Sequence, residues 1–311
     1  MAFRRLADFG YGCGMCARFT LTAPPDEVRS LFRYDDLPNF PPRYNIAPTQ
    51  PIAIVASFEG RRRFLLARWG LIPGWAKNPA DLPLLINARA ETVAEKPAFR
   101  GAFRHRRMLV PATGFYEWQK PHGPEKLRDF SDKPMQPKKA KGKQPFHIRL
   151  AGDLAPNGLF AFAGIWETYL GADGSEIDTA AILTLPSLPP VSQVHDRMPA
   201  VVMPADFDRW LDCRGTTPDE ALRLIVPGVR FDLFPVSTRV NSARQDDEGL
   251  TVPLAEPLTA AEPAPTGDVM TETLAPSPGQ SEGDRGERDL FGAPVVVTGK
   301  ARTKRGASKR R

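Results

Sequence analysis

The sequence is poor in cysteine. It contains three cysteines, Cys13, Cys16 and Cys213, among 311 residues. Three thiols cannot build the disulfide framework of a secreted domain, and so low a number is typical of a reducing compartment. The sequence therefore excludes a secreted disulfide scaffold and predicts a cytoplasmic protein.

A long apolar run is also lacking. The longest, residues 159–166, is far shorter than the ~18 to 20 residues that cross a bilayer. Arg4 and Arg5 lie near the start, but no apolar segment of the kind found in signal peptides follows them. We therefore expect no membrane span and no membrane partner.

Excess positive charge is absent from most of the chain, although the formal net charge is +6, with 42 Lys and Arg against 36 Asp and Glu. Seven of these basic residues, and no acidic ones, lie in residues 300–311 (KARTKRGASKRR). Without these seven, 35 basic residues remain against 36 acidic ones, so the body of the protein is nearly neutral. A basic tip of this kind favours sequence-independent attraction to phosphates.

Proline is abundant, with 33 residues, and its distribution divides the chain. Residues 247–311 lose apolar periodicity and become rich in Pro, Ala, Gly, Thr and Glu, which predicts a disordered linker that ends in the basic tip. Residues 119–144 are rich in Lys and Pro and are interpreted as a long basic hairpin loop. Residues 1–14 show no structural pattern and are interpreted as a leader or a misassigned start, which leaves 15–246 as one domain.

Short β-like runs bounded by Pro and Gly recur within this domain. They cover residues 51–58, 63–69, 108–112, 115–118, 146–150, 160–166 and 180–185. Helices are fewer: we expect one at 25–32, one at 204–211, and one that starts at Thr217 with Pro218 in its first position. Because long helices do not alternate with the strands, we predict an α+β fold of mostly antiparallel sheets curled like a barrel around one core.

Cys13 and Cys16 form a C-x-x-C pair. Such a pair is compatible with a redox motif or with half of a zinc site, but a second C-x-x-C is absent from the sequence, and a redox pair normally opens a helix after a strand. An incidental thiol is the alternative. The sequence predicts no metal site and no cofactor.

Three other polar residues lie in apolar or Gly/Pro-rich surroundings. Asn87 could bond a turn, Glu117 could be a strand carboxylate that faces water with Tyr116 and Trp118 on the other face, and His195 could be an ordinary core or surface histidine. Taken one at a time, each of these structural roles is favoured over a catalytic one.

Taken together, seven motifs resemble, in order, the SRAP family of SOS response-associated peptidases and abasic-site processing proteins. They are MCARF (15–19), RYNIAPT (43–49), RWGLIPGW (68–75), NARAET (87–92), GFYEW (114–118), QPF (144–146) and VHDRMP (194–199). The resemblance covers about residues 15–243. It implies an α+β domain that binds abasic sites in single-stranded DNA, with the family's active-site Cys, Asn, Glu and His at Cys16, Asn87, Glu117 and His195.

The implied reaction joins the α-amine and thiol of Cys16 to the aldehyde of an open abasic sugar as a thiazolidine. The α-amine has a reference pKa of ~7.7 to 8.0, so a usable fraction is neutral at physiological pH. His195 is the expected proton donor to the sugar, Glu117 the expected acceptor from the amine, and Asn87 the residue that holds Cys16. A free amine requires removal of the residues before Cys16, by self-processing or because translation starts at Met15.

DNA binding requires cations for phosphates and aromatic surfaces for bases. The expected contacts are Arg18, Arg43, Asn45, Trp75, Arg89 and Trp118, whereas for Trp69 we favour core packing. The protein is expected to act as a nucleoid-associated monomer that protects the lesion in the DNA damage response, with β-elimination, a lyase reaction, as a side path.

Two alternatives remain. The first is a cysteine-type hydrolase that cleaves its own leader and then other peptides or amides, and that is active without DNA. The second is a non-catalytic nucleic-acid-binding module whose affinity comes from the basic tail, and which would tolerate Cys16→Ser.

Overall fold

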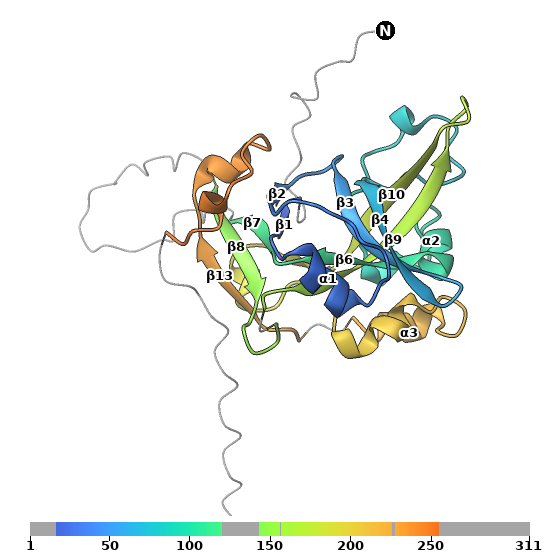
Figure 1. Cartoon of the computed structure of the whole chain (residues 1–311). Helices are drawn as coiled ribbons and strands as arrows, with labels where there is room; N and C mark the ends of the chain where they lie inside the picture. The colour runs from blue at the N-terminus through green and yellow to red at the C-terminus, as the bar shows by residue number, and fades with distance from the viewer. Residues whose placement is uncertain (1–16, 120–142, 156, 226–227, 255–311) are drawn as a thin grey trace, which may run out of the picture. The chain divides into compact units, whose positions relative to one another are not determined.

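The computed structural model describes residues 17–119, 143–155, 157–225 and 228–254 of the chain (Figure 1). All of them belong to one compact unit, Met1–Glu262. The expected leader, most of the expected loop at 119–144, and the expected disordered tail from residue 255 onward lie outside the described residues. The described fold continues beyond Asp246 to Leu254, and Leu250 is fully buried.

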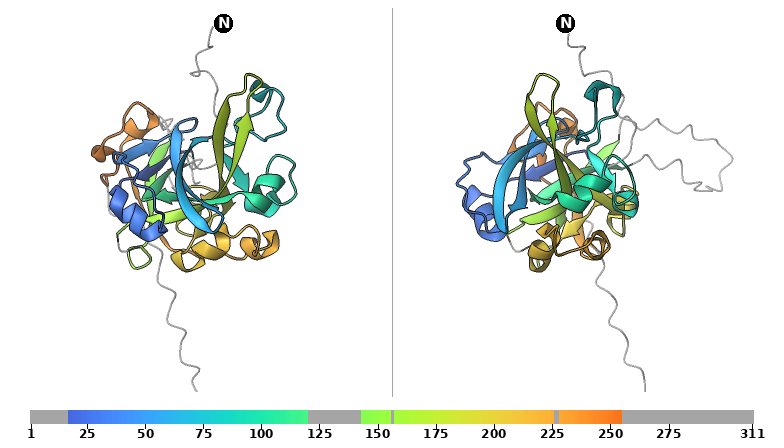
Figure 2. Two further views of the ribbon diagram at one scale, coloured as in Figure 1. Left: turned by 45° about the vertical axis from the view of Figure 1, so that its right-hand side comes forward. Right: turned by 90° about the vertical axis from the view of Figure 1, so that its right-hand side faces the viewer.

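A closed ring of five strands forms the centre of the fold. Its strands are β3 (Pro51–Phe58), β4 (Arg61–Trp69), β6 (Arg107–Ala112), β9 (Phe160–Leu170) and β10 (Glu176–Pro186). Antiparallel pairing runs from β4 through β3, β6 and β9 to β10, and a parallel β10–β4 pair closes the ring. The expected α+β fold with mostly antiparallel, barrel-like sheets is confirmed. The β9–β10 hairpin extends beyond the rest of the barrel (Figure 2).

A second antiparallel sheet packs beside the barrel. Its order is β13 (Phe231–Pro235), β8 (Gln144–Leu150), β7 (Gly114–Gln119), β1 (Phe19–Leu21) and β2 (Arg43–Ile46). Strands β7 and β8 pair with Gln119 opposite Gln144, so the two ends of the predicted hairpin are adjacent.

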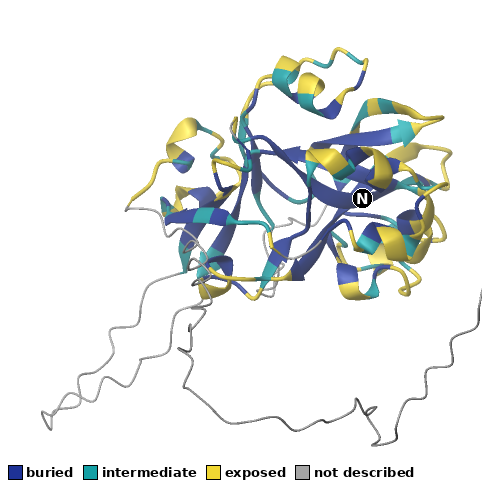
Figure 3. Cartoon of the chain, turned by 90° about the horizontal axis from the view of Figure 1, so that it is seen from below, coloured by how far each residue is buried: buried dark blue, intermediate teal, exposed yellow. Residues whose placement is uncertain are grey.

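Aromatic side chains join the two sheets. Phe19 of β1 makes edge contacts with Trp69 and Phe162 of the barrel, with ring centroids 5.2 and 5.8 Å apart, and Phe115 of β7 contacts Phe162 at 6.0 Å. All four rings are buried, which confirms core packing for Trp69. Buried residues lie mainly on the strands, and exposed ones on helices and turns (Figure 3).

Four short α-helices of the described residues lie around the sheets. They are α1 (Pro25–Phe32), α2 (Arg100–His105), α3 (Phe207–Leu211) and α4 (Pro218–Leu222). The start signal at Thr217 is confirmed: its hydroxyl accepts from the Glu220 N–H, while the Glu220 carboxylate accepts from the Thr217 N–H, a reciprocal cap that satisfies two exposed donors. No helix in the described part of the chain is long and apolar enough to span a membrane.

His147 of β8 is a buried titratable group. Its ring lies between Tyr116 and Phe234, with centroids 4.9 and 5.5 Å away. Burial, assisted by the charge of Arg149, lowers the pKa of His147 from 6.5 to about 3. The folded protein therefore holds a neutral histidine over a pH range in which the unfolded chain binds a proton.

We expect this histidine to make the fold sensitive to acid. Because the pKa is lower in the folded state, its contribution to stability is complete above pH 6.5 and is lost as the pH falls toward 3. The slope between these limits is about 1.4 kcal/mol of unfolding free energy per pH unit. Denaturant titrations from pH 7 to 4 would measure it. His147→Gln should reduce the slope by that amount, and an unchanged slope would contradict the assignment.

Candidate functional site

Asn87 lies on β5 (Asn87–Arg89), a short strand beside the C-terminal half of β10. The two strands run parallel, with Asn87 opposite Ile182 and Arg89 opposite Thr184. Asn87 is 7% exposed, whereas Arg89 is exposed at the strand end. The strand therefore presents a fixed, nearly buried amide and, two residues later, an accessible cation.

His195 lies just before β11 (Arg197–Pro199), which pairs with the end of β10. The His195 side chain is 3% exposed. Its Nδ1 is 3.1 Å from the main-chain N–H of Arg197, and 3.2 Å from both the Arg197 carbonyl and the Asp196 carboxylate. A neutral ring accepts at Nδ1 from the N–H, which places its proton on Nε2, and a charged ring donates from Nδ1 to either oxygen. The ring is thus held in both protonation states, as a proton-transfer group requires.

Glu117 lies on β7 and is 3% exposed. Its neighbours Tyr116 and Trp118 belong to a separate apolar cluster with Phe234, Val236 and Val240, whereas Phe115 packs in the main core. The predicted placement of Tyr116 and Trp118 on one face is confirmed, since both join the second cluster while Phe115 joins the main core. Strand alternation then puts Glu117 on the Phe115 face. The interpretation of Glu117 as a carboxylate that faces water is wrong, since both faces of this strand are covered.

Contacts between distant segments bring these residues into one region. The Arg197 guanidinium bonds to the Thr184 carbonyl and hydroxyl of β10 at 2.6 and 3.1 Å. Because Asn87 lies on β5 beside β10, and His195 precedes β11 on the other side, β10 carries both segments. Gln119 at the end of β7 donates to the Gln193 carbonyl at 3.5 Å, which ties the Glu117 strand to the His195 segment.

The first described residues enter the fold at the same place. The carbonyl of Arg18 accepts from the Tyr116 N–H at 2.9 Å, so the chain at Arg18 runs beside the part of β7 that carries Glu117. Cys13 and Cys16 lie outside the described residues, so the structure does not place the predicted nucleophile. Ala17, the residue after it, is the first described one.

The half-buried Arg18 and the buried Asn45 form a polar cluster. Arg18 Nη1 donates to Asn45 Oδ1 at 3.0 Å and to the Val240 carbonyl at 2.8 Å. Asn45 is fully buried, and its Nδ2 donates to the carbonyls of Val240, Ser242 and Gln245. The structure therefore buries Asn45, where it holds the 240–245 turn and Arg18.

Arg43 is held by an ion pair that the sequence did not suggest. Its Nε donates to Asp246 at 2.6 Å, and the same carboxylate accepts from the main-chain N–H of Tyr44 and Asn45. The two residues are 203 positions apart, so no local pattern could connect them. Asp246 is thus a supporting residue that sequence reasoning missed.

The two predicted tryptophans differ in accessibility. Trp75 is 59% exposed, with Nε1 donating to the Pro97 carbonyl at 3.3 Å. Trp118 is half-buried and donates to Asn241 Oδ1 at 2.7 Å. Trp75 and Arg89 are therefore the predicted DNA contacts most open to a ligand.

Glu91 and Arg197 form a second ion pair that sequence reasoning missed. The two side chains have opposite charges, and each lies inside one of the recognised motifs. The guanidinium of Arg197 bonds to both carboxylate oxygens of Glu91, and this bond lowers the pKa of Glu91. Glu91 follows Asn87 closely in the chain, and the main-chain N–H of Arg197 donates to His195 Nδ1. The pair therefore joins the Asn87 segment to the His195 segment.

We expect loss of this pair to affect chemistry more than stability. Glu91→Gln should lower about tenfold the single-turnover rate of a reaction in which His195 transfers a proton, because Arg197 then keeps only its bonds to Thr184 and the His195 ring is held less firmly. A tenfold loss corresponds to about 1.4 kcal/mol of barrier. The unfolding free energy should fall by no more than about 1 kcal/mol, as for other partly exposed pairs. Asp153→Asn, which breaks the exposed pair with Arg230, is the matched control and should leave the rate unchanged. Equal effects of both variants on the rate would contradict the positioning role.

The described residues contain no group of three His, Cys, Asp or Glu side chains that could hold a metal ion. What they do contain is a barrel-based α+β fold with a buried amide, carboxylate and imidazole on segments that meet at one end of β10 and β7. The fold and these three side chains define a class of protein in which groups able to transfer protons lie near the chain at Arg18.

Comparison with known proteins identifies the family. Residues 15–243 match the family described as SOS response associated peptidase (SRAP), and the chain belongs to it. The chain is 34% identical over 241 residues to the abasic site processing protein YoqW of Bacillus subtilis, covering 76% of this chain and 98% of that one. It is 28% identical to the abasic site processing protein HMCES of Rattus norvegicus over 331 residues, covering 94% of each.

Solved structures share the fold. A protein from Bacteroides thetaiotaomicron matches with a TM-score of 0.64 and 21% identity, covering 77% of this chain and all of that one. A phage-related protein from Bordetella bronchiseptica matches with a TM-score of 0.54 and 25% identity, covering 71% of this chain and 94% of that one.

Proposed function

We propose that this protein processes abasic sites in single-stranded DNA by attaching itself covalently to the lesion through Cys16. The observation that carries the proposal is that the SRAP motifs bearing Asn87, Glu117 and His195 are distant in sequence but lie on connected segments, next to where the chain at Arg18 enters. Relatives that carry the name abasic site processing protein support the substrate class.

The proposed reaction uses two adjacent nucleophiles of one residue. The α-amine of Cys16 attacks the aldehyde of the open sugar, and loss of water gives an imine. The thiol then adds across the C=N bond and closes a five-membered thiazolidine, with its proton transferred to nitrogen. Because both nucleophiles are on one residue, the second step is intramolecular and strongly favoured by proximity.

The described side chains fit the proton transfers. His195, with Nδ1 held by the Arg197 N–H, directs its Nε2 proton to the sugar O4′ as the ring opens. Glu117, covered on both faces of β7, accepts the proton that the attacking amine loses. Asn87 supplies a donor and an acceptor that do not titrate, which suits a residue that holds Cys16. If the imine persists, removal of the sugar 2′ proton expels the 3′ phosphate, the lyase side path.

The proposal requires a free amine on Cys16. Residues 1–15 must therefore be absent from the active protein, either through a start at Met15 followed by methionine removal or through cleavage of the Met15–Cys16 bond by the protein itself. Intact-mass measurement of natively expressed protein tests this requirement. An active protein that retains residue 1 or 2 at its N-terminus would rule out thiazolidine formation.

The substrate is tested with labelled oligonucleotides on denaturing gels. We expect covalent product with an abasic site in a single strand, and much less with an intact strand or an internal duplex site, because the aldehyde must reach groups that are nearly buried. Equal, non-covalent retention of all three DNAs would favour a binding module instead.

Deleting residues 255–311 should preserve the crosslink and flatten the salt dependence of binding, since the seven basic residues of the tip are lost.

A further inference from the structure

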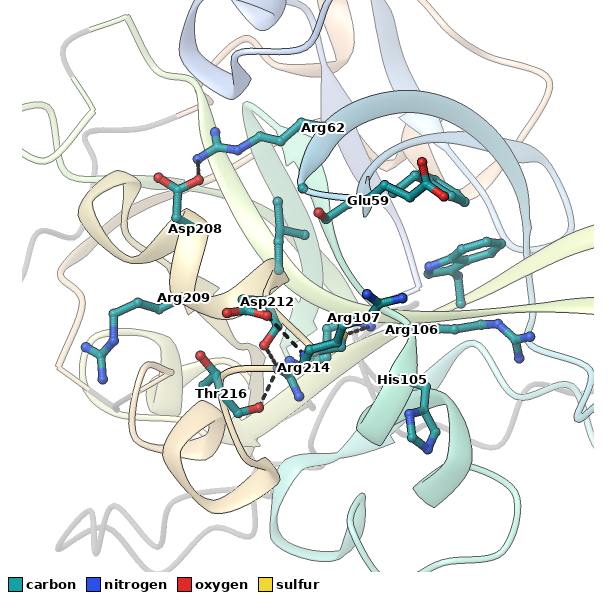
Figure 4. Close-up of a pocket in the computed structure, with 16 residues that line it drawn as sticks. Glu59, Arg62, His105, Arg106, Arg107, Asp208, Arg209, Asp212, Arg214 and Thr216 are labelled. Carbon is teal, nitrogen blue, oxygen red and sulfur yellow. Dashed lines mark hydrogen bonds and ion pairs between the residues drawn. The ribbon is translucent and has the colours of Figure 1, made fainter.

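A second concave site lies apart from the residues discussed above. A pocket of about 820 Å³ opens where the β3–β4 turn, the junction of α2 with β6, and the chain after α3 meet (Figure 4). This volume falls within the ~300 to 1,000 Å³ of small-ligand sites. Asn87, Glu117 and His195 are not among the residues that line it.

Cationic side chains dominate the charged lining. It contains three carboxylates, Glu59, Asp208 and Asp212, against five arginines and a histidine: Arg62, Arg106, Arg107, Arg209, Arg214 and His105. Two of the carboxylates are engaged. Asp208 pairs with Arg62 at 2.5 Å, and Asp212 accepts from the main-chain N–H of Gly215 and Arg214, which lowers its pKa. The charge of Asp212 also acts on Arg107 and Arg214, and Arg106 pairs with Glu167 outside the pocket. The exposed rim cations, Arg214 and His105, nevertheless have no carboxylate at ion-pair distance among the described residues.

Arg107 places a fixed positive charge beneath this surface. It is 1% exposed and donates to four main-chain carbonyls, those of Phe103, Trp210, Asp212 and Thr216. Within the described ranges, no carboxylate lies at ion-pair distance from it. Burial lowers the pKa of Arg107 although the nearby Asp212 charge opposes this shift, which reflects the cost of a buried charge whose direct hydrogen-bond partners are carbonyl dipoles. An anion in the pocket would reduce that cost.

The rim provides the direct contacts. Arg214 and His105 are exposed, and in the part of the chain that the structure covers neither pairs with a carboxylate. Arg209 instead points away from the other lining residues and pairs with Asp206 (Figure 4). Beside the cations, the exposed Phe58 ring lies 5.6 Å from the buried Trp166 ring, which the Arg106 guanidinium covers at 5.9 Å, so Phe58 is the open part of an aromatic wall.

We propose that this pocket binds the phosphate of a nucleotide, with Arg214 and His105 as its direct contacts. Guanidinium groups match phosphate in shape and charge, and an aromatic wall suits a base. A free nucleotide and a nucleotide within a DNA strand present the same group. When the nucleotide is part of a DNA strand, the pocket is a second contact for DNA, and this version of the proposal rests on the proposed function.

Two binding measurements on the full-length protein test this proposal. The first titrates pyrophosphate and a deoxynucleoside triphosphate by calorimetry, and the second titrates an unmodified single-stranded oligonucleotide by fluorescence anisotropy at several salt concentrations. Arg214→Glu and His105→Glu remove the contacts. Arg29→Glu, at an exposed arginine of α1 outside the pocket, carries the same charge change as Arg214→Glu and is the control. Thermal unfolding verifies that each variant is folded.

We expect the pocket variants to bind at least about tenfold more weakly in one or both measurements, as for loss of a hydrogen bond to a charged group. The Arg29→Glu control should stay close to the parent. Weakening confined to the free ligands identifies a nucleotide site, and weakening confined to the oligonucleotide identifies a strand contact. If the pocket variants match Arg29→Glu in both measurements, the proposal is overturned. Because none of the three ligands contains an abasic site, absence of crosslinking would count against the proposed function alone.

Discussion

Cys16→Ser should abolish the heat-stable DNA adduct almost completely while leaving the first bond-forming step in place. The variant keeps the α-amine, so it can still form an imine with the abasic aldehyde. A hydroxyl is a far weaker nucleophile than a thiol, so the ring does not close and the imine hydrolyses or proceeds to β-elimination. Reaction with and without borohydride, followed by denaturing gels, separates these fates.

The matched control is Cys213→Ser. Cys213 is half-buried and lines the pocket of Figure 4, where its Sγ accepts from the Arg107 N–H at 3.4 Å. A serine hydroxyl can accept the same bond, and at saturating DNA, where a change in affinity has no effect, Cys213→Ser should crosslink like the parent. A stable adduct formed by Cys16→Ser, or its loss in Cys213→Ser with the fold intact, would refute the assignment of Cys16.

His195→Ala should slow adduct formation and adduct reversal together, each by about 10²- to 10⁴-fold, the usual effect of removing one proton-transfer group. Both directions are affected because the same Nε2 proton serves the sugar oxygen when the ring opens and when it closes again. Single-turnover crosslinking and release of a preformed adduct measure the two rates. A large effect on one direction alone would show that His195 is not the shared donor.

Glu117→Gln provides the comparison within the same site. It should mainly slow imine formation, and the defect should shrink as the pH rises through the ~7.7 to 8.0 range of an α-amine, because the amine then loses its proton without assistance. His195→Ala should not be rescued in this way. If both variants crosslink at the parental rate across this range, neither proton-transfer role is correct.

The long strands were predictable from sequence because each carries its own signal. Residues 51–58 and 160–166 are apolar runs with Pro or Gly near their ends, and the structure forms β3 over Pro51–Phe58 and a longer β9 over Phe160–Leu170. Strands β1 and β5 have three residues each, and such strands are defined by their partners rather than by their own pattern. Helix α2 was not predicted because it has only 6 residues, fewer than two helical turns, which is too short to show a helical period of apolar residues.

The candidate site was predictable only from the motifs taken jointly. Asn87, Glu117 and His195 each have an ordinary structural explanation, and nothing local distinguishes them from many other buried polar residues. The supporting bonds, such as Arg43 with Asp246 and Arg197 with Glu91, join residues more than 100 positions apart. Only the tertiary fold creates them, and it also moves Asn45 from an expected DNA contact into the interior.

Strand β10 pairs with four others, β4, β5, β9 and β11, and so belongs at once to the closed ring and to the scaffold of Asn87 and His195. Local opening of this strand would release both side chains and break the ring in the same event. The part of the site that carries Asn87 and His195 is therefore coupled to the stability of the ring. In hydrogen exchange, the amides of β10 and β5 should open with a free energy close to that of global unfolding, unlike sites carried on loops that open locally at much lower cost.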